Sequence, residues 1–194
     1  MPVEYLKETP SQTAGPYVHI GTMPAFAGLS MRTQETPHIM AASGAANAIR
    51  IEGLVWDGSG YPVKDAMLEL WQADPAGAYH ASGFTGWGRA AADGDTGEWY
   101  FETVKPGPTL WRDGQMQAPH VSLLIFARGI NIHLHTRMYF PEDTDLLAHD
   151  PAMRRIEQPQ RRQTLIATAK PGAVPTYRFD IRLQGDQETV FFDM

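Results

Sequence analysis

The chain has 194 residues, of which 43% are hydrophobic and 20% are charged, and its formal net charge is −6. This length is sufficient for one domain with a hydrophobic core, and the composition is that of a soluble globular protein. The acidic charge and the lack of a basic patch argue against a nucleic-acid-binding surface. Because the sequence contains no cysteine, disulfides, thiolate metal ligands and a cysteine nucleophile are excluded.

The first residues and the longest apolar stretch bear on where the protein acts. The opening sequence MPVEYLKETPSQ has no apolar run of the kind found in signal peptides. The stretch VSLLIFA, which begins at Val121, is far shorter than the ~20 residues that a membrane-spanning helix needs. We therefore expect a cytoplasmic protein that does not enter a membrane.

The first 48 residues are expected to form an extended arm followed by a loop. Residues 1–24 contain four prolines that argue against a helix: Pro2, Pro10, Pro16 and Pro24. Residues 25–47 are rich in small residues without clear periodicity, which favours a loop that rests on the remainder of the protein.

Residues 49–194 are predicted to form the core of a β-sandwich. Apolar side chains alternate in IRIEGLVW (49–56) and in YRFDIRLQ (177–184), a pattern typical of half-buried strands. Further strands are expected at AMLELWQA (66–73), EWYFETV (98–104) and HVSLLIFA (120–127), and the last is apolar enough to be central. Only residues 142–158 suggest helix, with Pro151 interrupting it. The prediction is a single all-β domain over residues 1–194 with little helix.

Two histidines in NIHLHTRMYF (131–140) raise the question of a metal site. On a strand, His133 and His135 would point to the same face. A metal ion would need at least one further ligand, but the neighbours on that face, Asn131 and Arg137, are an amide and a cation. We interpret the two histidines as hydrogen-bonded groups at an interface or on a half-exposed face.

Two other stretches resemble the motifs of the intradiol ring-cleaving dioxygenases. In that family a tyrosine follows an LEVWQA-like strand, a second tyrosine closes a KPGPY loop, and two histidines lie in a PAHIHF strand. The corresponding sequences are ELWQADPAGAYHASGF (69–84) and KPGPTLWRDGQMQAPHVSLLIF (105–126). The resemblance implies a β-sandwich fold and, in the family, a ferric ion held by these two tyrosines and two histidines.

Transferred to this sequence, the family's four ligand positions fall on Tyr79, Thr109, His120 and Ser122. Thr109 and Ser122 carry neutral hydroxyls, which do not replace phenolate or imidazole well. The resemblance therefore implies a degenerate site, with no metal ligand set and no catalytic residue in this chain alone. Tyr79 and His120 would be remnants of the ancestral ligand set.

The resemblance extends over the whole chain to the non-iron chain of the two-chain members of the family. It is carried by residues 8–21, 126–140, 158–167 and 177–193. It implies a homologous beta chain that binds Fe(III), in an αβ hetero-oligomer that cleaves protocatechuate with O2 to 3-carboxy-cis,cis-muconate in aromatic catabolism. It also implies that five residues of this chain line the substrate pocket beside the partner's iron: Thr13, Gly15, Pro16, Tyr17 and Arg128.

Three alternatives remain at this point. Arg128 follows an apolar strand, so it could instead be a structural arginine bonded to loop carbonyls. The protein could be a sandwich scaffold or binding module without a part in catalysis, in which case substrate affinity would not depend on Arg128 or Thr13. It could also be an independent metalloenzyme that uses His133 and His135, which predicts stoichiometric metal on the isolated chain.

Overall fold

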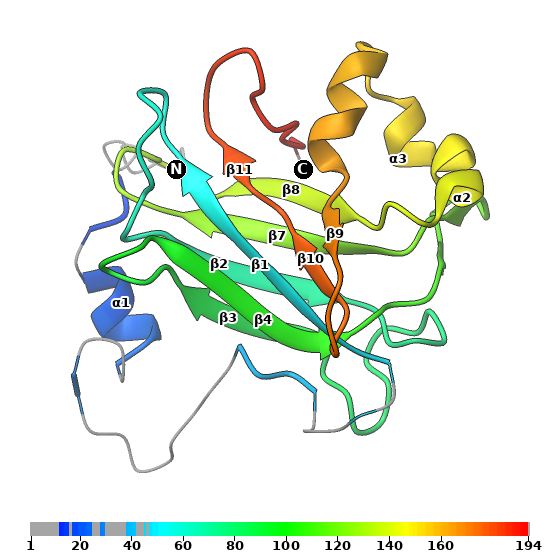
Figure 1. Ribbon diagram of the computed structural model, residues 1–194, viewed down its shortest axis with the longest axis horizontal. Coiled ribbons are helices and arrows are strands. Elements are labelled where there is room, and N and C mark those ends of the chain that lie inside the picture. Colours follow the sequence, from blue (N-terminus) through cyan, green and yellow to red (C-terminus); the bar gives the residue numbers. More distant parts are fainter. Residues whose placement is uncertain are drawn as a thin grey trace, which may run out of the picture.

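Two β-sheets packed face to face make up most of the protein (Figure 1). The structure is a computed structural model that describes residues 12–15, 17–24, 28–29, 38–41, 45 and 47–193. The all-β prediction is confirmed, because strands dominate and the helices are short. None of the helices in these residues has the length and hydropathy needed to cross a bilayer.

The first sheet is built around β1 (Ala48–Trp56). On one side β1 pairs antiparallel with β4 (Glu98–Val104). On the other side it pairs parallel with β10 (Thr176–Arg178) and then with β11 (Ile181–Arg182). The short strand β9 (Thr168–Lys170) pairs antiparallel with β10. Every second residue of β1 is buried, as the alternating sequence predicted, because one face packs on the core and the other faces solvent.

The second sheet has four antiparallel strands in the order β3, β2, β7 and β8. Their bounds are Trp87–Ala91 for β3, Met67–Gln72 for β2, His120–Phe126 for β7 and Leu134–Tyr139 for β8. The prediction that the apolar segment from His120 is central is confirmed, since β7 lies between β2 and β8. The sequence pattern did not indicate β3, whose residues WGRAA are small or mixed in character.

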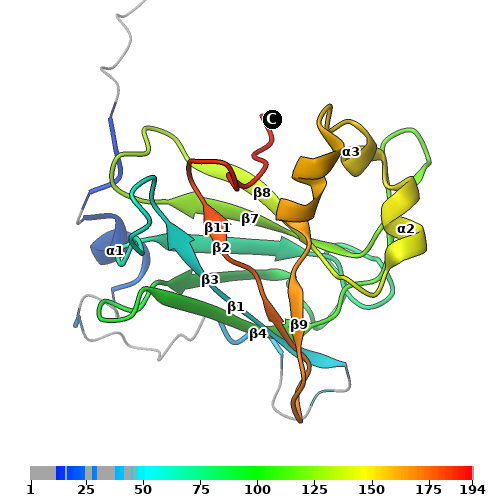
Figure 2. The same ribbon diagram turned by 45° about the horizontal axis from the view of Figure 1, so that its top comes forward.

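A layer of short helices covers one end of the second sheet (Figures 1 and 2). It consists of α2 (Thr144–His149), α3 (Pro151–Arg154) and the 3-10 helix η1 (Pro159–Leu165). Pro151 divides α2 from α3, as expected, and it occupies the first turn of α3, where its missing N–H is not needed. A small hairpin of β5 (Thr109–Leu110) and β6 (Met116–Gln117) lies beside these helices.

The space between the two sheets is filled by apolar side chains that alternate along the strands. Buried members include Ile51, Leu68, Trp99, Phe101, Leu123 and Ile125. A second, smaller cluster under the helical layer contains Ala118, Tyr139, Met153, Leu165 and Val190. Burial of this apolar surface is the main stabilising contribution, and the second cluster fixes the helices to the strand ends.

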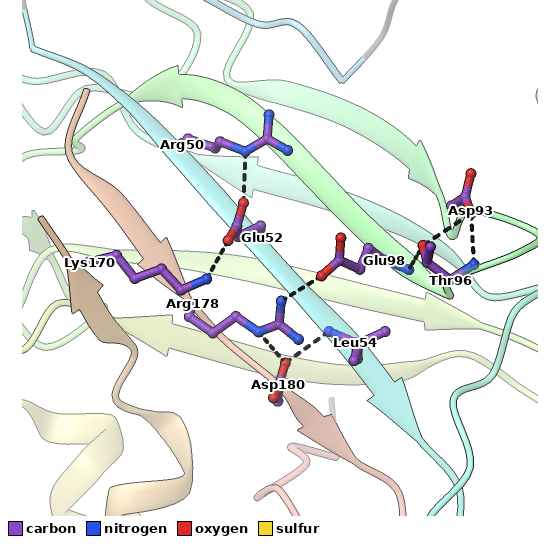
Figure 3. A network of polar contacts seen from close by, with 9 residues as sticks. All are labelled: Arg50, Glu52, Leu54, Asp93, Thr96, Glu98, Lys170, Arg178 and Asp180. Carbon is purple, nitrogen blue, oxygen red and sulfur yellow. Dashed lines mark hydrogen bonds and ion pairs between the residues drawn. The ribbon is translucent and has the colours of Figure 1, made fainter. Parts of the chain in front are cut away.

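The outer face of the first sheet carries a network of charged side chains (Figure 3). Glu52 on β1 accepts hydrogen bonds from Arg50 at 2.9 Å and from Lys170 at 2.7 Å. Arg178 on β10 donates to Glu98 at 3.1 Å. Glu98 and Lys170 are exposed, while Arg50, Glu52 and Arg178 are half-buried. Ion pairs at a surface contribute little to stability, so we interpret this face as a solvated surface.

The amino-terminal segment contains a helix that the sequence did not predict. The prediction that prolines exclude helix from residues 1–24 was wrong, because α1 spans Tyr17–Thr22. Its sequence YVHIGT lies between Pro16 and Pro24, so no proline interrupts it. Helix α1 lies at the opposite end of the sandwich from α2 and α3 (Figures 1 and 2).

Candidate functional site

Two loops that carry expected ligand positions are packed closely together. Gly77, near Tyr79, has a φ of +82°, and a Cβ atom there would lie 2.1 Å from the carbonyl oxygen of Pro108. Gly107 donates its backbone N–H to the carbonyl of Asp74 at 2.9 Å. The glycines thus let the Tyr79 loop and the loop before Thr109 approach one another, which a side chain would prevent.

Tyr79 and Ser122 are each neighbours of Trp71. The ring of Tyr79 stacks on that of Trp71 with centroids 5.9 Å apart, and Tyr79 is 38% exposed. Trp71 on β2 is the cross-strand partner of Ser122 on β7, and Ser122 is the partner of Arg137 on β8. Directly paired residues share a face of the sheet, so a tryptophan, a serine and an arginine form one row there.

Thr109 is connected to the same arginine. Its Oγ1 accepts a hydrogen bond from Nε2 of Gln117 at 3.0 Å, and Oε1 of Gln117 accepts one from Nη1 of Arg137 at 2.8 Å. Arg137 Nη1 also lies 3.4 Å from the hydroxyl of Tyr139. The guanidinium of Arg137 is therefore held among the residues that correspond to the family's ligands.

His120, at the start of β7, is buried and hydrogen-bonded away from a metal-binding role. Its Nδ1–H donates to the carbonyl of Ala118 at 2.8 Å, and its ring lies 5.6 Å from that of Tyr139. Burial, followed by the positive charge of Arg137, lowers the pKa of His120 to about 3. The imidazole is consequently neutral at physiological pH.

A buried carboxylate organises the helical layer around these residues. Asp150 caps α3 by accepting from the backbone N–H groups of Ala152 at 2.8 Å and Met153 at 2.9 Å. It also accepts from the N–H of Ala118 at 2.9 Å and from the hydroxyl of Tyr139 at 3.2 Å. Asp150 therefore ties the helix to both of the segments that contact His120.

The four positions do not fit a ferric ion. The threonine hydroxyl is hydrogen-bonded to Gln117, the histidine Nδ1–H to a carbonyl, and the tyrosine stacks on an indole. The cation Arg137 lies beside them, and a fixed positive charge opposes the binding of another. Within the described ranges, no three His, Asp or Glu side chains are grouped so that they could hold a metal.

His133 and His135 are not arranged as the strand spacing suggested. Only His135 belongs to β8; His133 precedes the strand, is exposed, and lies 5.7 Å from the ring of Phe126. His135 is buried against Phe192 at 5.8 Å. Burial and then the charge of Arg137 lower the pKa of His135 to about 4. The expectation that both side chains lie on one strand was therefore wrong.

At the other end of β7, the amino-terminal arm meets the loop that carries Arg128. Thr13 Oγ1 accepts from the N–H of Gly129 at 2.8 Å and donates to the carbonyl of Ile130 at 3.2 Å. Residues 13 and 129 are far apart in sequence, so this contact fixes the arm on the β7–β8 loop. Gly15 and Arg128 border the same cavity of about 260 Å³.

Arg128 is a solvent-exposed cation with a carboxylate partner. It forms an ion pair with Asp65, a carboxylate rather than a loop carbonyl, and its side chain is 73% exposed. Tyr17, the first residue of α1, is 82% exposed. Pro16 lies outside the described residues. The structure brings Thr13, Gly15 and Arg128 together, while the role of all five residues as substrate contacts stays a prediction.

Sequence reasoning missed the central position of Arg137. It identified this residue only as a neighbour of the two histidines, and it did not consider Gln117. The signal that could have indicated Arg137 is its strand pairing with Ser122, and that for Gln117 is its pairing with Thr109; both need the register of the strands. That register is not readable from a single apolar run.

Comparisons with known proteins agree with this geometry. The model of the Dioxygenase family matches residues 22–185. The chain is 50% identical to the protocatechuate 3,4-dioxygenase alpha chain of Pseudomonas putida, over 100% of both chains. It is 41% identical to the alpha chain of Burkholderia cepacia, over 97% of this chain and 98% of that one. The chain belongs to the intradiol dioxygenase family.

This intradiol dioxygenase is also similar to a beta chain, the second chain type among these relatives. It is 33% identical to the protocatechuate 3,4-dioxygenase beta chain of B. cepacia, over 73% of this chain and 66% of that one. The names of these relatives imply that those enzymes are hetero-oligomers of alpha and beta chains.

Solved structures support the fold. The dioxygenase domain of a dioxygenase–carbohydrate-binding fusion protein from Streptomyces sp. SirexAA-E matches with a TM-score of 0.58 and 22% identity, over 95% of this chain and 100% of that one. Fe(III) is the metal of the intradiol dioxygenase family.

Proposed function

We propose that this chain is the alpha, non-iron subunit of a cytoplasmic protocatechuate 3,4-dioxygenase. With a homologous beta chain that binds Fe(III), it would carry out the O2-dependent cleavage of protocatechuate to 3-carboxy-cis,cis-muconate. The proposal is supported chiefly by the 50% identity over the full length of the Pseudomonas alpha chain. The unsuitable ligand set around Arg137 supports the assignment of the iron to the partner.

The contribution of this chain would be recognition of the substrate's carboxylate. Transfer of a carboxylate out of water is unfavourable unless hydrogen-bond donors or a cation compensate. Arg128 offers an exposed guanidinium, and its ion pair with Asp65 orients it without burying it. A substrate carboxylate could therefore join or replace Asp65 as the partner of Arg128.

The arm would position this arginine. Thr13 holds the N–H of Gly129 and the carbonyl of Ile130, the two residues that follow Arg128. Restriction of this loop reduces the conformational entropy that substrate binding would otherwise cost. Gly15 borders the cavity next to Arg128, where a side chain would take up space near the substrate.

The test is to express the chain alone, a homologous beta chain alone, and both together. Iron content, visible absorption and protocatechuate-dependent O2 uptake are then measured for each. We expect the chain alone to be colourless and inactive, and the complex to show the phenolate-to-iron absorption band and activity. The beta chain alone is the matched control for the iron assignment.

Three results would contradict the proposal. Stoichiometric iron and ring-cleaving activity on the isolated chain would place the metal site here instead. Stoichiometric binding of another metal to the isolated chain, lost on changing His133 or His135, would favour the independent metalloenzyme. If the complex forms but its activity does not change when this chain is removed, the chain is a scaffold.

A further inference from the structure

A cavity of about 540 Å³, partly open to solvent, lies at the Arg137 end of the protein, between the β5–β6 hairpin, β8, α3 and the carboxyl-terminal segment. The side chains that define its character are Trp111, Arg112, His135, Arg137, Arg155 and Phe192. Its volume lies in the range of small-molecule sites, roughly 300–1,000 Å³. The proposed function does not use this cavity.

Three arginines gather around a single indole ring in its wall. The guanidinium carbons of Arg112 and Arg137 each lie 5.4 Å from the ring centroid of Trp111, and that of Arg155 lies 5.2 Å from it. The negative faces of an aromatic ring attract cations, but one ring does not neutralise three charges.

None of the three arginines forms an ion pair with a carboxylate in the part of the chain that the structure describes. By contrast, Arg89 pairs with Glu69, and Arg178 pairs with Glu98 and Asp180. Asp193 also borders the cavity, so one carboxylate accompanies three guanidiniums. In a protein with a net charge of −6, this excess of positive charge is a local feature that an incoming anion would relieve.

The wall also contains polar nitrogens that lack partners. Trp111 Nε1, His135 Nδ1 and Arg137 Nε are buried and have no hydrogen-bond partner among the described residues. Buried polar groups are usually bonded to protein, ordered water or a ligand. The depressed pKa of His135 has the charge of Arg137 as its second cause after burial, so the cationic field already acts on groups in this wall.

The other walls are apolar and aromatic. Trp111 and Phe192 present rings, and the ring of Phe192 lies 5.7 Å from the guanidinium carbon of Arg137. Leu110 and Ala152 complete this apolar surface. An inorganic anion would contact the arginines alone, whereas a ligand with an aromatic ring would also pack against the rings of Trp111 and Phe192.

We propose that this cavity binds an aryl carboxylate, a small molecule of the benzoate class. Its carboxylate is held by the guanidiniums of Arg112 and Arg155, with Arg137 behind them, and its ring packs against Trp111 and Phe192. The site belongs to this chain and requires no iron. It goes beyond the proposed function, since that function places substrate recognition at Arg128.

The test is calorimetric titration of the full-length chain with benzoate, and separately with inorganic phosphate. We expect saturable binding of one benzoate per chain, with Kd at or below about 1 mM. Arg155→Gln and Arg112→Gln should each weaken benzoate binding by about tenfold, because each removes a charge-assisted hydrogen bond. Arg154→Gln is the matched control: it makes the same charge change on the same helix but does not line the cavity, so affinity should stay within about twofold.

Several outcomes would overturn this proposal. Absence of saturable benzoate binding would do so, as would equal effects of Arg155→Gln and Arg154→Gln. Binding of phosphate without benzoate would mean that the aromatic walls do not select the ligand. Because Arg112 lies in a different segment from Arg155, failure of one variant to fold leaves the other as a test. The readout requires neither a partner nor iron, so it is separate from the test of the proposed function.

Discussion

The two ends of β7 place an arginine in different environments. Arg128, just after the strand, is open to solvent and paired with Asp65. Arg137 lies on β8 opposite Ser122, near the start of β7; it is half-buried and bonded to the neutral groups of Gln117 and Tyr139. His120 and Phe126, the ends of β7, are separated by about 20 Å.

The difference indicates two uses of the same side chain. A cation that has an exposed carboxylate partner can exchange it for a ligand at small cost, because water solvates both charges during the exchange. Burial, and after it the charge of the half-buried Arg137, lowers the pKa values of His120 and His135, and the same charge opposes a metal ion. Arg137 and the positions that correspond to the family's ligands therefore belong to one structural feature.

Asp150→Ala should affect the Arg137 end more than any other single change. It leaves the N–H of Ala118 and the hydroxyl of Tyr139 without their acceptor and removes the cap of α3. We expect a loss of about 3–5 kcal/mol in the free energy of unfolding, measured with urea.

Asp145→Ala, in the exposed first turn of α2, is the control and should cost at most about 0.5 kcal/mol. In Asp150→Ala, hydrogen exchange of the Gly129 amide, which is bonded to Thr13, should become faster only as far as global unfolding becomes more frequent. A loss of less than about 1 kcal/mol for Asp150→Ala would show that this carboxylate does not anchor the helical layer.

The pH dependence of stability should reflect His120. Its pKa is about 3 in the folded protein and about 6.5 in the unfolded chain, so below pH 6.5 the unfolded state binds the proton first. This contribution is complete above pH 6.5 and is lost as the pH falls, by about 1.4 kcal/mol per pH unit and about 2–3 kcal/mol by pH 4.5.

His120→Asn keeps a donor for the carbonyl of Ala118 and removes the titrating group. The loss of stability between pH 6.5 and 4.5 should therefore be smaller by about 2–3 kcal/mol, with a correspondingly smaller slope. His135 contributes with the same sign and remains in this variant. His149→Asn, which makes the same substitution at an exposed histidine, is the control. An unchanged slope in His120→Asn would mean that the imidazole is not held neutral by its surroundings.

Arg128→Ala should have the smallest effect on stability but a specific effect on substrate. Because the ion pair with Asp65 is exposed, the free energy of unfolding should change by at most about 0.5 kcal/mol. In the complex with a beta chain, the KM for protocatechuate should rise about tenfold, or about 1.4 kcal/mol, with the iron absorption band retained. Arg154→Ala, an exposed arginine on α3, is the control. An unchanged KM for Arg128→Ala would contradict carboxylate recognition by this residue.

The sequence predicted those parts of the fold in which one local pattern determines the structure. Alternation in residues 49–56 and the apolar run from His120 correctly indicated β1 and a central β7. Strand β3 was missed because WGRAA has neither β-branched residues nor alternation, and its pairing with β2 stabilises it. Helix α1 was missed because prolines at both flanks were interpreted as breakers.

The candidate site could be predicted only at the positions that belong to a sequence motif. Thr109 and Ser122 could be identified as departures from the family pattern by reading along the chain. The connection from Thr109 through Gln117 to Arg137 joins β5, β6 and β8, so it depends on tertiary packing. The same holds for the three arginines around Trp111, which come from separate segments of the chain. Whether the arm residues contact substrate stays a prediction.

The parallel pairing of β1 with β10 and β11 has a consequence for synthesis of the protein. The partners of Arg50–Glu52 and Val55–Trp56 are residues 176–178 and 181–182, which leave the ribosome more than a hundred residues later. Until then β1 has one open edge with unpaired N–H and C=O groups, and such edges promote intermolecular pairing. A nascent or truncated chain that lacks these last strands is consequently a species prone to self-association, and chaperones would have to protect it until translation ends.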